Sequence, residues 1–308
     1  IPTYLATVRS FLEINDIDLK WKKIKKFYPD KIKISGQNAY STEHVKKMLS
    51  VTTKLQHRAL IHFHASTGCR AGSIFYEYDK SLKRALTIGD LRDMPHGCQM
   101  VTIYRDTKDE YSTFLTPEAV IEIENFLTAR KNKGEILNNE SPLFIKLNGT
   151  PMTEMDAKQI FKRIVTVANV RGQMKNGRYP VQLVHGFRKR FNTIMKLNNS
   201  VNDNAIEKMM GHQKGLDGTY LQITDERLFE EFYKGITDLT ISDEFRDKLK
   251  IRELEKAKPD DEEIITKIMP EVLIHLRKEL GLGTITNDAV DTLNKEQLKN
   301  LVKNFLVN

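Results

Sequence analysis

The chain has 308 residues, 40% of them hydrophobic and 29% charged, and its 49 Lys and Arg exceed its 41 Asp and Glu for a net charge of +8. This length supports one large domain or two ordinary ones. No stretch approaches the roughly 18–20 consecutive apolar residues of a membrane helix, which excludes a membrane-spanning protein, and the two cysteines are too few for a disulfide scaffold, which favours an intracellular setting.

Residues 1–40 are predicted to form one or two short helices with too few apolar residues for a core of their own. Because the chain begins at Ile1 rather than Met, we expect this segment to be the end of a longer N-terminal domain. A capped helix is predicted after Ser41, and a second, apolar helix ends at Gly68.

The next part of the chain changes to the period-two pattern of strands. Three short strands are predicted at 86–88, 100–104 and 111–115, and the polar residues 105–110 form the tip of a hairpin. Pro117 then opens a helix. The later predicted helices are 153–168, 186–197 and 202–210. We therefore expect residues 41–241 to form a mainly α domain with a small antiparallel β-sheet, an α+β fold.

Composition changes again after Ser242. Residues 243–258 are dense in charge, as in a solvated helix or helical linker, and two amphipathic segments follow at 264–280 and 295–306. We expect 242–308 to be a C-terminal helical extension; a loosely ordered tail is the alternative.

Charge is distributed unevenly between these parts. Residues 1–240 carry 37 basic against 27 acidic residues, whereas 241–308 carry 12 against 14. A basic body favours a polyanionic partner, although charge alone leaves a merely solvated basic surface equally open.

Metal and nucleotide motifs are missing from the sequence, which has no His-Glu-x-x-His, no paired Cys-x-x-Cys and no Walker loop. We therefore expect neither a metal nor a cofactor. The sequence offers instead a spaced set of cations, histidines and one tyrosine. In chain order they are Arg70 in Thr67-Gly-Cys-Arg70, His185 and Arg188 in His185-Gly-Phe-Arg188, His212 in Met210-Gly-His212, and Tyr220. Each alone is typical of a surface or packing residue, but their order and spacing together indicate one site.

On these motifs the sequence resembles the tyrosine recombinases, the integrase family of site-specific DNA recombinases, over residues 41–241. The segment 216–232 is most similar to the archaeal integrases of this family, and the resemblance implies an integrase of a mobile element or virus. The resemblance implies a tyrosine recombinase catalytic domain, with 1–40 as the remnant of a core-binding domain. Many members have an acidic residue three positions after the first arginine, where this chain has Ser73.

The resemblance also implies a mechanism. Tyr220 would be the nucleophile, Arg70 and Arg188 would stabilise charge on the phosphate, and His185 would be the base. His212 would donate a hydrogen bond to the phosphate, and Lys108 on the hairpin would protonate the departing 5′ oxygen. The 3′-phosphotyrosyl product would conserve the bond energy, so that rejoining needs neither metal nor ATP.

The partner implied is double-stranded DNA with att-type sites, bound by a homo-tetramer in an intracellular, nucleoid-associated setting. Lys189, Arg190 and Lys196 are expected to contact backbone phosphates, with plain surface charge as the alternative for each. Three other readings remain open: a type IB topoisomerase-like enzyme, an inactive DNA-binding relative, and a helical scaffold whose polar constellation is accidental.

Overall fold

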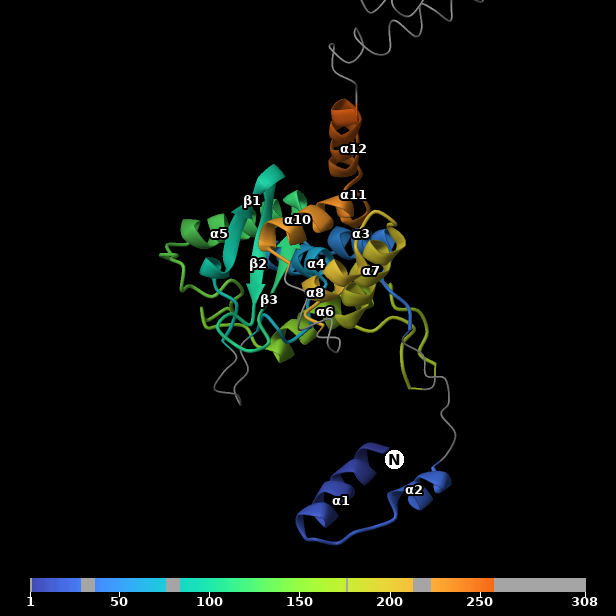
Figure 1. The fold of residues 1–308 in the computed structure, drawn as a ribbon. Coiled ribbons are helices and arrows are strands. Elements are labelled where there is room, and N and C mark those ends of the chain that lie inside the picture. Colours follow the sequence, from blue (N-terminus) through green and yellow to red (C-terminus); the bar gives the residue numbers. More distant parts are fainter. Residues whose placement is uncertain (1, 29–36, 76–83, 176, 213–222, 258–308) are drawn as a thin grey trace, which may run out of the picture.

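The computed structural model describes residues 2–28, 37–75, 84–175, 177–212 and 223–257. Tyr220 and the amphipathic segments 264–280 and 295–306 lie outside these residues. Figure 1 shows helices gathered around one small sheet, with the first two helices apart from this body. The helices before the sheet are α1 (Pro2–Ile14), α2 (Trp21–Ile24), α3 (Thr42–Ser50) and α4 (Leu55–Thr67).

The helices after the sheet supply most of the remaining body. They are α5 (Pro117–Asn132), α6 (Glu154–Val167), α7 (His185–Leu197), α8 (Asp203–Met209), α10 (Asp225–Lys234), α11 (Ile236–Leu239) and α12 (Asp243–Ala257). The predicted helices after 153, 186 and 202 are therefore confirmed. Among the described residues, no helix combines the length and apolarity that a bilayer crossing requires.

The sheet has the order β1 (Leu91–Met94), β2 (Cys98–Ile103) and β3 (Tyr111–Leu115), with both pairings antiparallel. The mainly α fold with a small antiparallel sheet is thus confirmed, but the predicted strand at 86–88 is wrong. Leu86 instead makes single backbone bonds to Ile74 and Leu143, and residues 88–90 form a 3-10 turn.

Two hydrophobic cores lie on opposite faces of the sheet and meet at α7. On one face, Val101 and Ile103 join the core of α3 to α6. On the other, Met100 and Phe114 join the core of α8, α10 and α11. Helix α7 contributes Phe187 to the first core and Phe191 to the second, so this helix is buried on more than one side.

The C-terminal part is fastened to the body by a buried carboxylate. Glu118, in the first turn of α5, accepts the backbone N–H groups of Ile241 and Ser242 at 2.6 and 2.9 Å, and Lys46 pairs with Asp243 at 2.7 Å. These bonds place the start of α12 against α3 and α5.

Candidate active site

The turn that carries Arg70 is fixed by the end of α4. Gly68 adopts a left-handed conformation (φ +57°) that ends the helix. The preceding residues are tied to β3, because Ser66 Oγ donates to the Phe114 carbonyl at 3.1 Å and Thr113 Oγ1 donates to the Thr67 carbonyl at 3.0 Å. Arg70 thus projects from a rigid turn between helix and sheet.

Ser73, three positions after Arg70, closes this turn. Its hydroxyl donates to the Arg70 carbonyl at 2.7 Å. A serine therefore holds the backbone of the turn without adding a negative charge beside the guanidinium of Arg70.

Arg188 joins the three sequence motifs. It lies on α7, is 4% exposed, and donates through Nη1 to the Gly68 carbonyl at 2.9 Å and through Nη2 to the Met210 carbonyl at 2.7 Å. The same Nη2 lies 2.7 Å from Nε2 of His212. One planar guanidinium group therefore binds the loop after α4 and the loop after α8.

Arg70 completes this junction from the other side, since its Nη2 donates to the Gly211 carbonyl at 3.2 Å. Burial lowers the pKa of Arg188, and the charge of Arg70 lowers it further. A bound anion would therefore stabilise the charged form of Arg188 at this junction.

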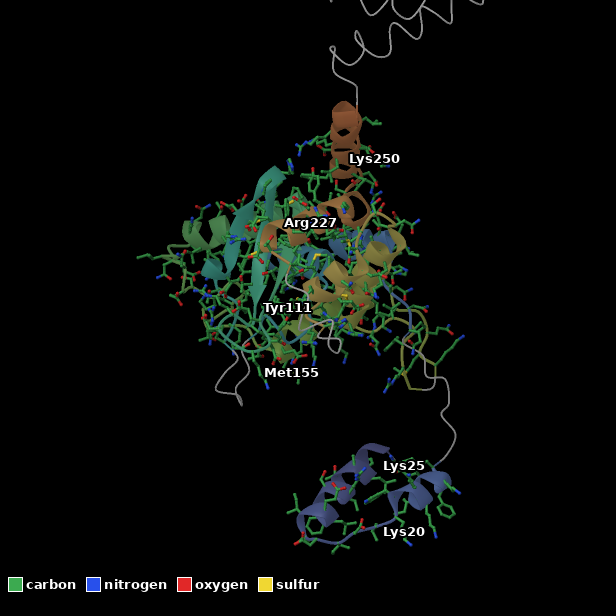
Figure 2. All side chains as sticks on the ribbon, in the orientation of Figure 1. Lys20, Lys25, Tyr111, Met155, Arg227 and Lys250 are labelled. Carbon is green, nitrogen blue, oxygen red and sulfur yellow. The ribbon has the colours of Figure 1, made fainter. Side chains whose placement is uncertain are left out.

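A cavity of about 320 Å³ opens beside Arg70. Its lining residues are Arg70, Asp109, Glu110, Tyr111, Lys208, Gly211 and His212; Tyr111 is labelled in Figure 2. Lys108 precedes the first of these hairpin residues, is exposed, and has no hydrogen bond or ion pair with the described residues. The hairpin thus brings its lysine to the neighbourhood of the cavity.

His185 begins α7 and is exposed, three residues before Arg188. Partial burial lowers the pKa of His185, and the charges of Lys189 and Arg188 lower it further. The ring is therefore neutral near pH 7 and able to accept a proton.

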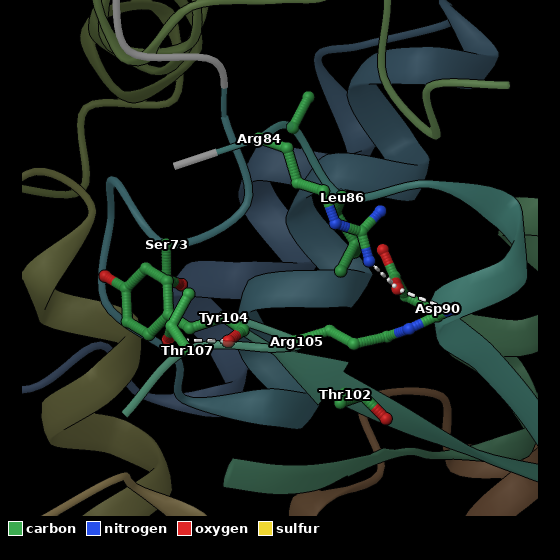
Figure 3. A pocket seen from close by; sticks show the side chains of 9 residues that line it. Ser73, Arg84, Leu86, Asp90, Thr102, Tyr104, Arg105 and Thr107 are labelled. Atoms are coloured by element: carbon green, nitrogen blue, oxygen red, sulfur yellow. Dashed lines mark hydrogen bonds and ion pairs between the residues drawn. The ribbon is translucent and has the colours of Figure 1, made fainter. Parts of the chain in front are cut away.

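A second, smaller pocket lies at the base of the hairpin (Figure 3). Asp90 is 4% exposed and accepts from Arg84 at 2.6 Å and from Arg105 at 3.0 Å. Arg105 also donates to the Gly89 carbonyl at 3.1 Å. These bonds fix the residue that begins the hairpin tip, three positions before Lys108.

The expected phosphate contact by Arg190 is wrong. Its side chain is 1% exposed, and it donates to the Leu239 carbonyl at 3.0 Å and to Thr42 Oγ1 at 3.1 Å. Burial lowers the pKa of Arg190 to about 10, opposed by the charge of Glu118. Arg190 therefore ties α11 and α3 to α7 instead of facing a ligand.

We expect Arg190→Ala to lower the free energy of unfolding by about 1–3 kcal/mol for each buried acceptor that is left without its donor, such as the Leu239 carbonyl. Urea denaturation measures this loss. Lys189→Ala, on the same helix and partly exposed, should change stability by less than about 1 kcal/mol. Equal stability of Arg190→Ala and wild type would contradict the buried role.

Lys189 and Lys196 remain on the surface side of α7. Lys189 is partly exposed and Lys196 exposed, but the ammonium of Lys196 lies 2.5 Å from Glu207 Oε1. Its charge is therefore already paired within the protein.

Two residues near the site were not predicted from the sequence. Tyr111 packs its ring against Gly211, where an added Cβ would lie 2.5 Å from the ring, and burial raises the pKa of its phenol. Glu207 contacts His212, with Oε2 at 2.6 Å from Nδ1. Among the described residues, no group of three or more His, Cys, Asp or Glu is arranged to hold a metal ion.

In a comparison with protein families, the phage integrase family model matches residues 40–216 of this chain. A search of curated proteins found no match. Similar solved structures include XerA recombinase (16% identity, TM-score 0.45, covering 66% of this chain and 65% of that one) and the integrase from mycobacterium phage Brujita (17%, 0.48, 78% and 72%). The Tn1549 transposon integrase in complex with transposon right end DNA is also similar (19%, 0.44, 70% and 70%). The chain thus spans slightly less than two-thirds of XerA recombinase.

Proposed function

Because this chain belongs to the phage integrase family, whose model matches residues 40–216, we propose that it is a site-specific tyrosine recombinase that cleaves and rejoins DNA strands. The resemblance read from the sequence is thereby confirmed at the level of the family, whereas an archaeal or viral origin stays a prediction. We propose residues 41–241 as the DNA breaking and rejoining domain, between a core-binding remnant at 1–40 and a helical extension at 242–308.

The convergence of Arg70, Arg188 and His212 carries this proposal. These residues come from three distant parts of the chain, yet one guanidinium group contacts the loops of the other two. Arg70 and His212 also line the cavity beside them. Paired guanidinium forks suit the non-bridging oxygens of a phosphodiester, and they remain charged at any working pH.

The reaction follows from these groups. The Tyr220 hydroxyl attacks phosphorus and loses its proton to His185, the phosphorus–oxygen bond to the 5′ side breaks, and Lys108 gives the departing oxygen its proton. Arg70 and Arg188 stabilise the charge that develops on the non-bridging oxygens, together with a hydrogen bond from His212. Attack by another 5′ hydroxyl reverses these steps and releases the tyrosine.

The partners follow from the same chemistry. Recombination between two duplexes cuts four strands, each of which needs one tyrosine, so we propose a homo-tetramer on double-stranded DNA with att-type sites. Lys189 and Lys196 are proposed to contact backbone phosphates, the latter after exchanging its pairing with Glu207. A DNA substrate implies action inside the cell, at the nucleoid.

Tyr220→Phe is expected to abolish covalent attachment to DNA while leaving DNA affinity unchanged, because it removes only the nucleophilic oxygen. The protein is incubated with nicked suicide duplexes, and covalent adducts are detected on a denaturing gel. Because the target sequence is not known, the duplexes are first selected from a library of randomised sequences. The adduct should form with wild type and be absent from the variant. An adduct of undiminished yield in Tyr220→Phe would remove Tyr220 from the reaction.

The alternatives give different results in the same series. An inactive DNA-binding relative binds DNA in a salt-dependent manner but forms no covalent adduct. A helical scaffold whose polar constellation is accidental shows neither salt-dependent DNA binding nor an adduct. A type IB topoisomerase-like enzyme forms the adduct but fails to join two marked sites, which a recombinase joins.

A further inference from the structure

A nearly buried carboxylate lies behind the histidine of the site. Glu207 is on α8 and its side chain is 12% exposed. One oxygen, Oε2, lies 2.6 Å from Nδ1 of His212, and the other, Oε1, lies 2.5 Å from Nζ of Lys196. The carboxylate therefore holds the histidine while an ammonium on α7 holds the carboxylate.

This contact determines which edge of the His212 ring faces the arginine. A carboxylate accepts hydrogen bonds only, so the proton at Nδ1 points to Glu207. The other ring nitrogen, Nε2, is thereby directed to Nη2 of Arg188 at 2.7 Å. The main chain reinforces this orientation, because the N–H of His212 donates to the Glu207 carbonyl at 2.9 Å.

We infer that Glu207 is a positioning residue, which fixes the Nδ1 proton of His212 and aims Nε2 at the phosphate. This inference rests on the proposed function. In the DNA-free protein, Nε2 accepts from Arg188, because a guanidinium group can only donate. When a phosphate takes the guanidinium donors, Nε2 donates to an oxygen only if the ring carries a second proton. The carboxylate at Nδ1 holds the ring in this orientation, as carboxylates behind functional histidines do elsewhere.

The first test observes the bond without DNA. A short hydrogen bond between an imidazole N–H and a carboxylate gives a far-downfield proton resonance in an NMR spectrum. We expect this resonance in wild type. Its absence from His212→Gln would assign it to His212. Glu207→Leu, of similar volume but without an acceptor, should lack the resonance. Glu207→Gln should retain a shifted one, because its amide oxygen still accepts. Absence of the resonance from wild type would overturn the inference.

The second test measures the consequence for cleavage. In single-turnover assays on a selected suicide duplex, Glu207→Leu should cleave about 10–100-fold more slowly than wild type at unchanged DNA affinity, and Glu207→Gln should recover most of the rate. Glu122→Gln is the matched control, since that carboxylate is 14% exposed and is also paired to a cation at 2.5 Å, from Arg58. It should keep both the resonance and the rate.

The outcomes separate this inference from the function on which it rests. If wild type forms no adduct with any duplex, the proposed function fails, while the resonance still decides whether Glu207 holds His212. If wild type cleaves and Glu207→Leu cleaves equally fast, the positioning role is wrong. If Glu207→Leu fails to fold, Glu207→Gln decides the question. The positioning role is supported if Glu207→Gln keeps both the resonance and the wild-type cleavage rate. It is rejected if Glu207→Gln loses the resonance and still cleaves at the wild-type rate.

Discussion

Arg188→Lys is expected to reduce the rate of DNA cleavage by a factor of at least about 10²–10³, the usual effect of losing one donor to a developing oxyanion. The guanidinium of Arg188 donates to the Gly68 and Met210 carbonyls at 2.9 and 2.7 Å at the same time. A lysine keeps the charge but lacks the planar fork, so its ammonium satisfies one of these carbonyls at the expense of the other. Single-turnover cleavage of a suicide duplex measures the effect.

The matched variant is Arg70→Lys. Arg70 is exposed and makes one hydrogen bond with the described part of the chain, to the Gly211 carbonyl, so this variant should lose cleavage to a similar degree while unfolding at nearly the wild-type urea concentration. Arg188→Lys should also lose about 1–3 kcal/mol of stability for each buried carbonyl left unpaired. Cleavage at the wild-type rate by either variant would remove that arginine from the site.

The two arginines differ in burial, since Arg188 is 4% exposed and Arg70 is exposed, and the sequence motifs do not reveal this difference. The spacing of the motifs predicts that both cations meet one anion, and the structure brings both to the loop before His212. What spacing does not reveal is that Arg188 is also a structural bridge, because its acceptors are backbone carbonyls of loops distant in the chain.

Helix α7 shows where sequence patterns stop being informative. Arg188 and Arg190 are two residues apart, so they project from opposite sides of the helix. A helix with one solvated side would expose one of them, but α7 lies between two cores and buries both. The burial of Arg190 depends on α3 and α11 packing over it, and the sequence pattern of α7 does not reveal these tertiary contacts.

Glu207 was missed for a related reason. On the sequence it is one acid in a short polar helix, five residues before His212. Its importance arises from the packing of α8 on α7, which brings Lys196 to its second oxygen. The strand β1 was missed because two of its four residues are charged and exposed, which hides the period-two pattern of a strand.

Gly68→Ala is expected to destabilise the protein by about 2–5 kcal/mol, as the sum of two costs. A left-handed conformation (φ +57° here) costs a residue with a side chain about 1–2 kcal/mol. The added Cβ would also lie 2.5 Å from Cβ of Phe191, and overpacking of this kind costs about 1–3 kcal/mol. Because the Phe191 Cβ is fixed to the backbone of α7, no rotation of that side chain relieves the clash.

Gly134→Ala separates the two costs. Gly134 also follows a helix and has a positive φ of +88°, but an added Cβ would meet nothing within 4 Å. Its replacement should therefore show the conformational cost alone, about 1–2 kcal/mol, in the same urea titration. Gly68→Ala should additionally slow cleavage, since relieving the clash displaces the Gly68 carbonyl from Arg188 and moves the turn that carries Arg70. If the two alanine variants lose equal stability, then the close approach of α4 to α7 at Phe191 is not what requires a glycine at position 68.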